Sequence, residues 1–139
     1  MKITLSATTK AIIVVICFIA SVIGFLMKLP SSFHHIDKEL HFAFYFLAAA
    51  FFNLLFTVRK FSVHLVIFLI LFLFGVGIEV AQENYNKVFH VRFHGRFDPQ
   101  DVKANVTGLI SFSILWLVIM LISLASRSAK KSSHSANQQ

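Results

Sequence analysis

The residues of this chain that could do chemistry lie at helical spacing beside very apolar stretches. Asp37, His41 and Tyr45 follow one another at intervals of four, so on a helix they form one stripe. A carboxylate beside an imidazole can orient the ring and raise its basicity, which makes His41 a candidate acid–base or ligand-binding residue. Asp37 has a second explanation, because a carboxylate in the first turn of a helix interacts favourably with the helix dipole.

Glu79 and Gln82 form a second pair near the end of another apolar stretch, and Glu83 lies on the same helical face. A carboxylate that follows a long apolar run is costly in a membrane unless it is paired, so Glu79 and Gln82 are candidate site residues. The alternative is that these side chains only extend to the membrane interface.

A third polar stripe opens the last apolar stretch. Asp101, Asn105 and Gly108 share one face of a helix, where Asn105 needs a partner and Gly108 allows a neighbouring helix to approach closely. Asp98 and Pro99, just before them, are typical of the N-cap and the first residue of that helix. Asp101 and Asn105 are therefore candidate site residues, whereas capping accounts for most of Asp98.

Residues 89–98 alternate between mainly aromatic and mainly cationic positions, which predicts an extended strip at the membrane interface. Arg92 and Arg96 lie on the cationic face, and the planar donors of arginine suit phosphate. Both are candidate phosphate ligands, although a strip that binds lipid headgroups without specificity would show the same pattern.

Metal binding depends on whether the polar groups meet in space. Four of the candidates would offer oxygen and nitrogen ligands for a hard or mixed site if they converged: Asp37, His41, Glu79 and Asp101. Their spacing alone does not bring them together, so we predict no metal and no cofactor.

Four apolar stretches must position these groups, at residues 11–27, 41–58, 61–80 and 102–125. Each approaches the roughly 20 residues that a helix needs to cross a membrane, and the first is too long for the core of a cleaved signal peptide. The chain is 57% hydrophobic and 14% charged, against about 25% charged in soluble domains, so it suits lipid rather than water.

We therefore predict an all-α membrane protein with four transmembrane helices in an antiparallel bundle, because backbone polar groups in lipid must be satisfied within each helix. An extended interfacial loop would join the third and fourth helices. Residues 1–125 would form one transmembrane domain, and the polar residues 126–139 a disordered cytoplasmic tail.

The charge distribution predicts an orientation. All six acidic residues fall within residues 37–39 and 79–101, at one face of a four-span bundle. The opposite face holds both termini, has no acidic residue and has seven basic ones: Lys2, Lys10, Arg59, Lys60, Arg127, Lys130 and Lys131. We therefore predict a multi-pass protein of the inner (plasma) membrane. The positive-inside rule places both of its termini in the cytoplasm. The net charge of +7 then reflects orientation and contact with anionic lipid, and no nucleic-acid partner is expected.

Taken together, the polar motifs resemble those of the VanZ-like family of small bacterial membrane proteins. The resemblance covers most of the chain, from about residue 35 to the fourth apolar stretch. It rests on four motifs: Asp37-Lys38-x-x-His41-Phe42 with Tyr45, Glu79-x-x-Gln82, Gly95-Arg96, and Asp101-x-x-x-Asn105-x-x-Gly108. The connector between Gln82 and Arg96 is longer than in the family pattern, so Arg92 is an alternative to Arg96. The family is named for a protein associated with resistance to teicoplanin, and its members have no settled biochemical activity. The resemblance therefore implies a cell-envelope membrane protein but no defined reaction.

Three functions fit these patterns. The first is binding of an anionic lipid or a lipid-linked phosphate precursor, with arginine on the phosphate and the other candidates forming the pocket. The second is an enzyme acting on a phospholipid or lipid-linked headgroup, with catalytic candidates His41, Asp37, Glu79 and Asp101. No Ser or Cys nucleophile is evident for it. The third is structural, with polar side chains joining the helices at an average of about 0.6 kcal/mol per hydrogen bond. Of the three, we expect lipid binding, and the sequence leaves the oligomeric state open.

Overall fold

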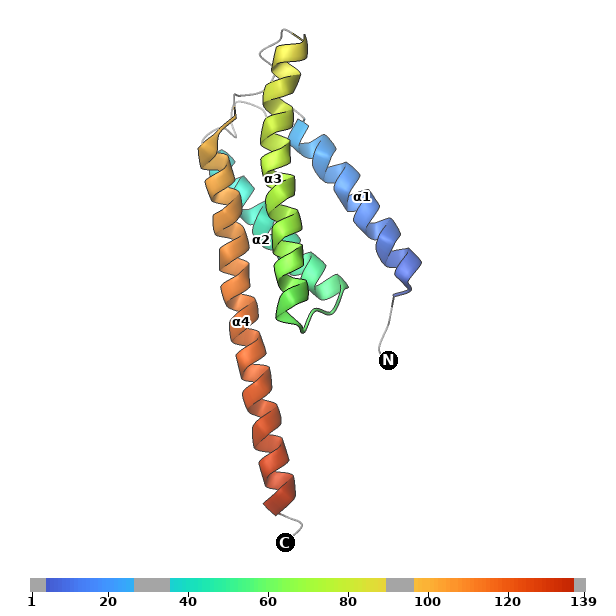
Figure 1. Cartoon of the computed structure of the whole chain (residues 1–139), viewed down its shortest axis with the longest axis vertical. Coiled ribbons are helices and arrows are strands. Elements are labelled where there is room, and N and C mark those ends of the chain that lie inside the picture. The colour runs from blue at the N-terminus through green and yellow to red at the C-terminus, as the bar shows by residue number, and fades with distance from the viewer. Residues whose placement is uncertain (1–4, 27–35, 90–96, 137–139) are drawn as a thin grey trace.

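The chain folds as four α-helices in this computed structural model, which describes residues 5–26, 36–89 and 97–136. The helices are α1 (Ala7–Leu26), α2 (Asp37–Leu55), α3 (Phe61–Phe89) and α4 (Pro99–Ala136). Each helix runs opposite to the one before it along the long axis, and α2 crosses obliquely behind α3 (Figure 1). Within the described residues there is no strand, so the prediction of an all-α fold is confirmed.

Three of the four helices are long and apolar enough to cross a membrane, judged by length and composition. The qualifying segments are Ala7–Leu26, Phe61–Tyr85 and Pro99–Lys130. Helix α2 is not among them, because its first turn is charged and it carries His41 and Asn53 further along. These criteria therefore support three of the four predicted transmembrane helices. The apolar helices are compatible with a membrane protein.

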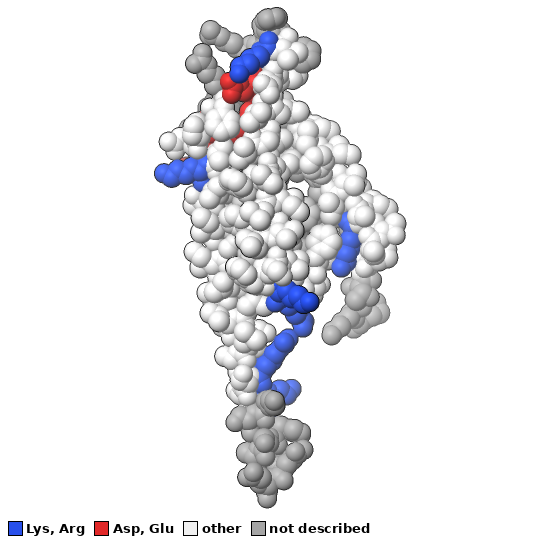
Figure 2. Space-filling view, viewed as in Figure 1, with Lys and Arg blue, Asp and Glu red and all other residues white. Residues whose placement is uncertain are grey.

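The surface is apolar over most of its length. Large hydrophobic side chains are exposed on all four helices, which is unfavourable in water and suits contact with lipid tails. Figure 2 shows a broad surface without charge, with the visible Asp and Glu side chains gathered at one end and Lys or Arg towards both ends. This banded distribution gives the molecule an acidic end and a basic end.

Two helices are longer than the sequence predicts. Helix α3 continues past Val80 to Phe89, since no Gly or Pro follows Gly77 within it, so residue 89 is helical rather than extended. The remainder of the predicted strip, residues 90–96, lies outside the described residues. Helix α4 continues through residues 126–136, where the sequence predicted a disordered tail, because the chain contains no Gly or Pro after Gly108.

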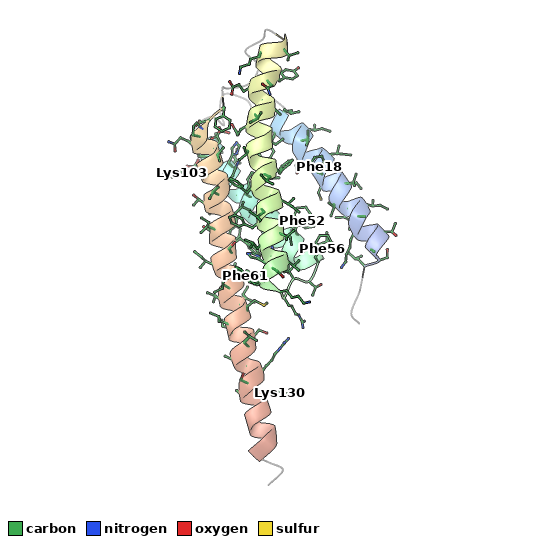
Figure 3. The ribbon with its side chains drawn as sticks, viewed as in Figure 1. Phe18, Phe52, Phe56, Phe61, Lys103 and Lys130 are labelled. Atoms are coloured by element: carbon green, nitrogen blue, oxygen red, sulfur yellow. The ribbon has the colours of Figure 1, made fainter. Side chains whose placement is uncertain are left out.

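The core lies mainly between α2 and α4. Its buried residues are Tyr45, Ala49, Val58, Leu71, Leu109, Phe112 and Trp116. The two helices approach closely at Gly108, where an added Cβ would lie 2.4 Å from the carbonyl oxygen of Phe42. This confirms the predicted role of Gly108. Helix α1 is different, because it has no buried residue and packs on the rest through rings, such as Phe18 against Phe74 at 5.5 Å between centroids (Figure 3).

A hydrogen-bonded turn reverses the chain between α2 and α3. The amide of Val58 donates to the carbonyl of Asn53 at 2.9 Å, and the amide of Thr57 donates to Leu54 at 3.0 Å. This pair of bonds is a Schellman motif, which requires a left-handed residue after the helix. Thr57 supplies it with φ of 50° in place of the usual glycine. The turn places α2 and α3 next to each other.

Candidate functional site

Polar residues from three helices meet at the acidic end of the molecule. We call this group the charged cluster: Asp37, Lys38 and His41 of α2, Glu79 of α3, and Asp98, Asp101 and Asn105 at the start of α4. Although the charged cluster lies at an end of the molecule, several of its side chains are deeply buried, with Glu79 only 1% exposed and Asn105 only 2% exposed. Buried polar groups are costly unless they are paired, so the contacts among them decide what the cluster can do.

His41 is the centre of the cluster. Its Nδ1 lies 2.9 Å from Asn105 Oδ1, and its Nε2 lies 4.0 Å from both Asp37 Oδ1 and Asp101 Oδ2. An amide oxygen only accepts hydrogen bonds, so Nδ1 donates its proton to Asn105. In the neutral ring, Nε2 then carries a lone pair that faces two carboxylates. The predicted stripe of Asp37 and His41 is confirmed, but the strongest contact of His41 is with α4 rather than within α2.

Lys38 joins the two helix starts. Its ammonium donates to Asp101 Oδ1 at 3.1 Å and to Asp98 Oδ2 at 3.2 Å. The hydrogen bond to Asp101 is the main reason that the pKa of Lys38 is raised. The sequence pattern predicts no separate role for Lys38, although Lys38 is part of the Asp37-Lys38 motif. Its place beside the carboxylates of another helix could not be read from spacing along one helix.

Asp98 caps α4 as the sequence predicts. Its Oδ1 accepts a hydrogen bond of 2.8 Å from the backbone N–H of Gln100, and this bond is the main reason that the pKa of Asp98 is lowered. The backbone N–H of Asp98 itself donates to Glu79 Oε2 at 3.2 Å. Glu79 of α3 therefore takes the place that Asp101 would hold in a local capping box, and Asp101 is left to bind Lys38.

Among the residues that the structure describes, two buried polar atoms close to this cluster have no hydrogen-bond partner: Glu79 Oε1 and the hydroxyl of Tyr45. Tyr45 is fully buried, and a Cβ at Gly75 would lie 2.9 Å from both its hydroxyl and Asn105 Nδ2. Because Gly75 has no side chain, there is room beside it for the Tyr45 hydroxyl and the Asn105 amide. A buried polar atom without a partner is uncommon in folded proteins and calls for an explanation, such as a bound water or ion.

Not all of the predicted site residues belong to the cluster. Five of the eight ligand-binding candidates come together there: Asp37, His41, Glu79, Asp101 and Asn105. Gln82 instead donates to the backbone carbonyl of Phe25 at 2.8 Å and so holds the end of α1 against α3. Glu83 pairs with Lys87 at 2.7 Å on the surface, in agreement with a surface role. Arg92 and Arg96 lie outside the described residues.

The cluster also brings together three of the four conditional metal ligands. One ligand atom each of Asp37, His41 and Asp101 lies within 4.8 Å of the others. Glu79, the fourth, is not part of this trio, and its Oε2 accepts a hydrogen bond from the backbone N–H of Asp98. Taken over its described side chains, the charged cluster holds four carboxylates against one lysine and one histidine, so it attracts cations more readily than anions.

A second polar group, which sequence analysis missed, lies further from the acidic end, near the α2–α3 turn. We call it the neutral cluster: Asn53, His64, Ser113 and Trp116. His64 Nδ1 lies 2.9 Å from Asn53 Oδ1, its Nε2 lies 3.0 Å from Ser113 Oγ, and its ring stacks on the indole of Trp116 at 4.3 Å. The only signal in the sequence is one polar residue in each of three apolar stretches, which predicts no particular pairing.

Comparison with known proteins adds no relative. No family model matches the chain, and no curated protein and no solved structure matches it. What the site does is therefore argued from its own geometry.

Proposed function

We propose that this is a VanZ-like membrane protein of the cell envelope, in which the carboxylates of the charged cluster hold basic residues that bind the phosphate-bearing headgroup of an anionic lipid or a lipid-linked precursor. The observation that carries the proposal is the buried, cross-linked charged cluster at one end of an otherwise apolar surface. Ionisable residues at the end of an apolar helical body are expensive to keep there and mark functional sites by default. The site lies where lipid headgroups would be.

The topology that we propose has four crossings, with α2 as the additional one and both termini in the cytoplasm. Helix α2 has 19 residues, which corresponds to about 28 Å of helix and nearly spans a hydrocarbon core of about 30 Å. Both termini lie away from the acidic end in Figure 1, and the basic residues Lys10, Arg59, Lys60, Arg127 and Lys130 fall on the elements at that side. This arrangement supports an outward-facing charged cluster.

Phosphate recognition in this proposal comes from cations around the rim of the cluster. Lys38 is half exposed and held by Asp98 and Asp101, so it can present its ammonium to a headgroup. Arg96, with Arg92 as the alternative, follows in the connection between α3 and α4 and would supply the planar donors. The carboxylates position these cations, and Asn105 fixes the ring of His41.

The test is purification of the protein in native lipid, followed by mass spectrometry of the bound lipids. Arg96→Ala should lose one class of anionic or phosphate-linked lipid that the wild type retains. Lys103→Ala is the matched control, because Lys103 is a cation on the first part of α4 whose side chain points away from the other helices (Figure 3). Identical lipids in the wild type and in both variants would contradict the proposal.

A second candidate function, headgroup hydrolysis or transfer, rests on the lone pair of His41 Nε2 beside Asp37 and Asp101. A fixed imidazole with a free nitrogen is suited to act as a general base. If the protein turns a lipid over, His41→Ala should accumulate a lipid that the wild type lacks. A wild type and a His41→Ala variant that carry the same intact lipid would favour binding alone.

A further inference from the structure

The ring of His41 presents an arrangement that is incomplete without a cation. When the ring is neutral, Nδ1 donates to Asn105 and the lone pair of Nε2 faces Asp37 Oδ1 and Asp101 Oδ2, each 4.0 Å away. Three electron-rich atoms that face one another repel unless a positive charge lies between them. The separation of 4.0 Å is too long for a direct hydrogen bond between ring and carboxylate, so no such bond occupies the gap.

The size of this gap fits a metal ion. Two of the three separations, both from His41 Nε2, are 4.0 Å. If the third were the same, an ion at equal distance from the three atoms would lie about 2.3 Å from each, close to the distances of metal–oxygen and metal–nitrogen bonds. The largest separation in the trio is within 4.8 Å, so a modest closing of the side chains completes the fit. Two of the three residues are buried, which limits competition from water.

The groups around the trio are arranged as the outer shell of a metal site usually is. A metal-binding histidine normally donates its other ring N–H to a fixed acceptor, and Asn105 Oδ1 fills that role at 2.9 Å. Lys38 binds Asp101 only through Oδ1 and leaves Oδ2 directed at the ring.

An independent observation points to a missing ligand. Glu79 is 1% exposed, and its Oε1 has no partner, while its Oε2 is anchored to the backbone of Asp98 beside the cluster. A buried carboxylate oxygen left in this way requires a proton, a water or a cation. A water bound to an ion at the trio is a natural partner for it.

We propose that Asp37, His41 and Asp101 bind a divalent transition-metal ion, with Asn105 and Glu79 in the outer shell. One imidazole and two carboxylates form a mixed donor set that suits Zn²⁺ or Mn²⁺ better than Ca²⁺ or Mg²⁺, which prefer oxygen ligands alone. The ion would neutralise the excess of carboxylates in the charged cluster and offer its remaining positions to a phosphate oxygen. That last role rests on the proposed function, whereas the metal site itself does not.

The test uses the full chain in detergent micelles, carrying a purification tag without histidine and stripped with EDTA. Co²⁺ is the probe, because its visible absorption reports nitrogen and oxygen coordination directly, and Zn²⁺ should displace it. Wild-type protein should bind one Co²⁺ per chain. Asp37→Asn and Asp101→Asn should each weaken binding by about 100-fold, and Asn105→Leu by about 10-fold.

Two controls separate loss of the site from loss of the fold. Glu83→Gln removes a carboxylate at the same end that is paired with Lys87, and it should bind Co²⁺ like the wild type. His64→Gln removes a buried histidine with no carboxylate beside it and should also bind normally. Fluorescence of Trp116, in the neutral cluster, checks that each variant is folded. A wild type that binds no Co²⁺, or equal affinity in Asp37→Asn and Glu83→Gln, would overturn the proposal.

The result is separable from the lipid experiment. Metal binding is measured without native lipid, so a chain that binds Co²⁺ but co-purifies no phosphate lipid keeps the metal site and loses the proposed lipid function. A chain that loses its lipid in Arg96→Ala but binds no Co²⁺ keeps the lipid function and overturns the metal site.

Discussion

The charged cluster and the neutral cluster are built on the same pair of side chains. In each, the Nδ1 of a histidine lies 2.9 Å from the Oδ1 of an asparagine on another helix, His41 with Asn105 and His64 with Asn53. The difference lies at the other ring nitrogen. Nε2 of His64 meets the hydroxyl of Ser113 at 3.0 Å, whereas Nε2 of His41 meets two carboxylates at 4.0 Å.

This difference favours a structural role for the neutral cluster and the binding role that we propose for the charged cluster. Around His64 each polar side chain has at least one partner among the described residues, because Asn53 also donates to the carbonyl of Ala49 and Ser113 to that of Leu109, and Trp116 covers the ring. A neutral hydrogen-bonded network of this kind joins helices and needs nothing further. Around His41, four carboxylates face one lysine and one histidine, and Glu79 Oε1 has no partner among the described residues, which supports the ligand site that we propose there.

The largest effect should come from breaking the helix contact on which both clusters depend. Gly108→Ala places a Cβ 2.4 Å from the backbone carbonyl of Phe42, which cannot move aside as a side chain could. We expect the free energy of unfolding to fall by about 3 kcal/mol or more, measured by thermal or denaturant unfolding in detergent. Gly77→Ala is the control, because nothing lies within 4 Å of its added Cβ. It should stabilise the helix by about 0.5–1 kcal/mol. Equal stability of the two variants would mean that α2 and α4 do not pack at Gly108.

The next effect tests the two histidines against each other. His64→Leu leaves Asn53 Oδ1 and the Ser113 hydroxyl without their partner in a buried site, and each loss costs about 1–3 kcal/mol. We expect His64→Leu to lower the unfolding temperature strongly and to leave ligand binding intact. His41→Gln should do the reverse, with a smaller loss of stability and a complete loss of binding. If both variants lose stability and binding equally, the division of roles is wrong.

A smaller effect is expected from Lys38→Met, which retains the length of the side chain and removes its charge. Lys38 is half exposed, so its two ion pairs contribute only about 0–1 kcal/mol each. Stability should therefore fall by less than about 2 kcal/mol. Because Asp101 Oδ1 is released, Co²⁺ affinity should rise rather than fall. A drop in Co²⁺ affinity, measured in the same titration as above, would show that Lys38 supports the trio instead of competing with it.

The smallest effect concerns the turn beside the neutral cluster. Thr57 adopts φ of 50°, a conformation that costs a residue with a Cβ more than it costs glycine. Thr57→Gly should stabilise the chain by roughly 0.5 kcal/mol, seen as a slight rise in the unfolding midpoint, without any change at the charged cluster. A loss of stability would mean that the side chain of Thr57, rather than its backbone, holds the turn.

The two clusters also differ in how far the sequence predicts them. Asp37, His41, Asp101 and Asn105 stand out because charged or amide groups at helical spacing beside apolar stretches are conspicuous, and the structure brings them together. Asp98 and Pro99 mark the start of α4 correctly because capping is local chemistry. In contrast, the neutral cluster joins single polar residues from α2, α3 and α4, and periodicity within one helix carries no information about which residues of different helices meet.

The same limit explains the remaining differences. The sequence assigns Glu79 to Gln82, but the structure links Glu79 to the backbone of Asp98 and Gln82 to Phe25, because both contacts are made between helices. The fall in hydropathy predicts that α3 ends at residue 80 and α4 at residue 125. The helices continue beyond both points, because a fall in hydropathy does not by itself interrupt the backbone hydrogen bonds of a helix.

The lack of buried residues in α1 has a consequence for how the protein is assembled in a bilayer. Helix α1 is apolar enough to enter lipid by itself, and its contacts with the other helices, through Phe18, Phe25 and Gln82, are few. Helix α2 has the opposite character, because its buried face carries His41, Tyr45 and Asn53, which lipid tails cannot solvate. In the topology that we propose, we therefore expect α1 to insert and dock in separate steps, and α2 to enter the membrane only together with the helices that shield its polar face.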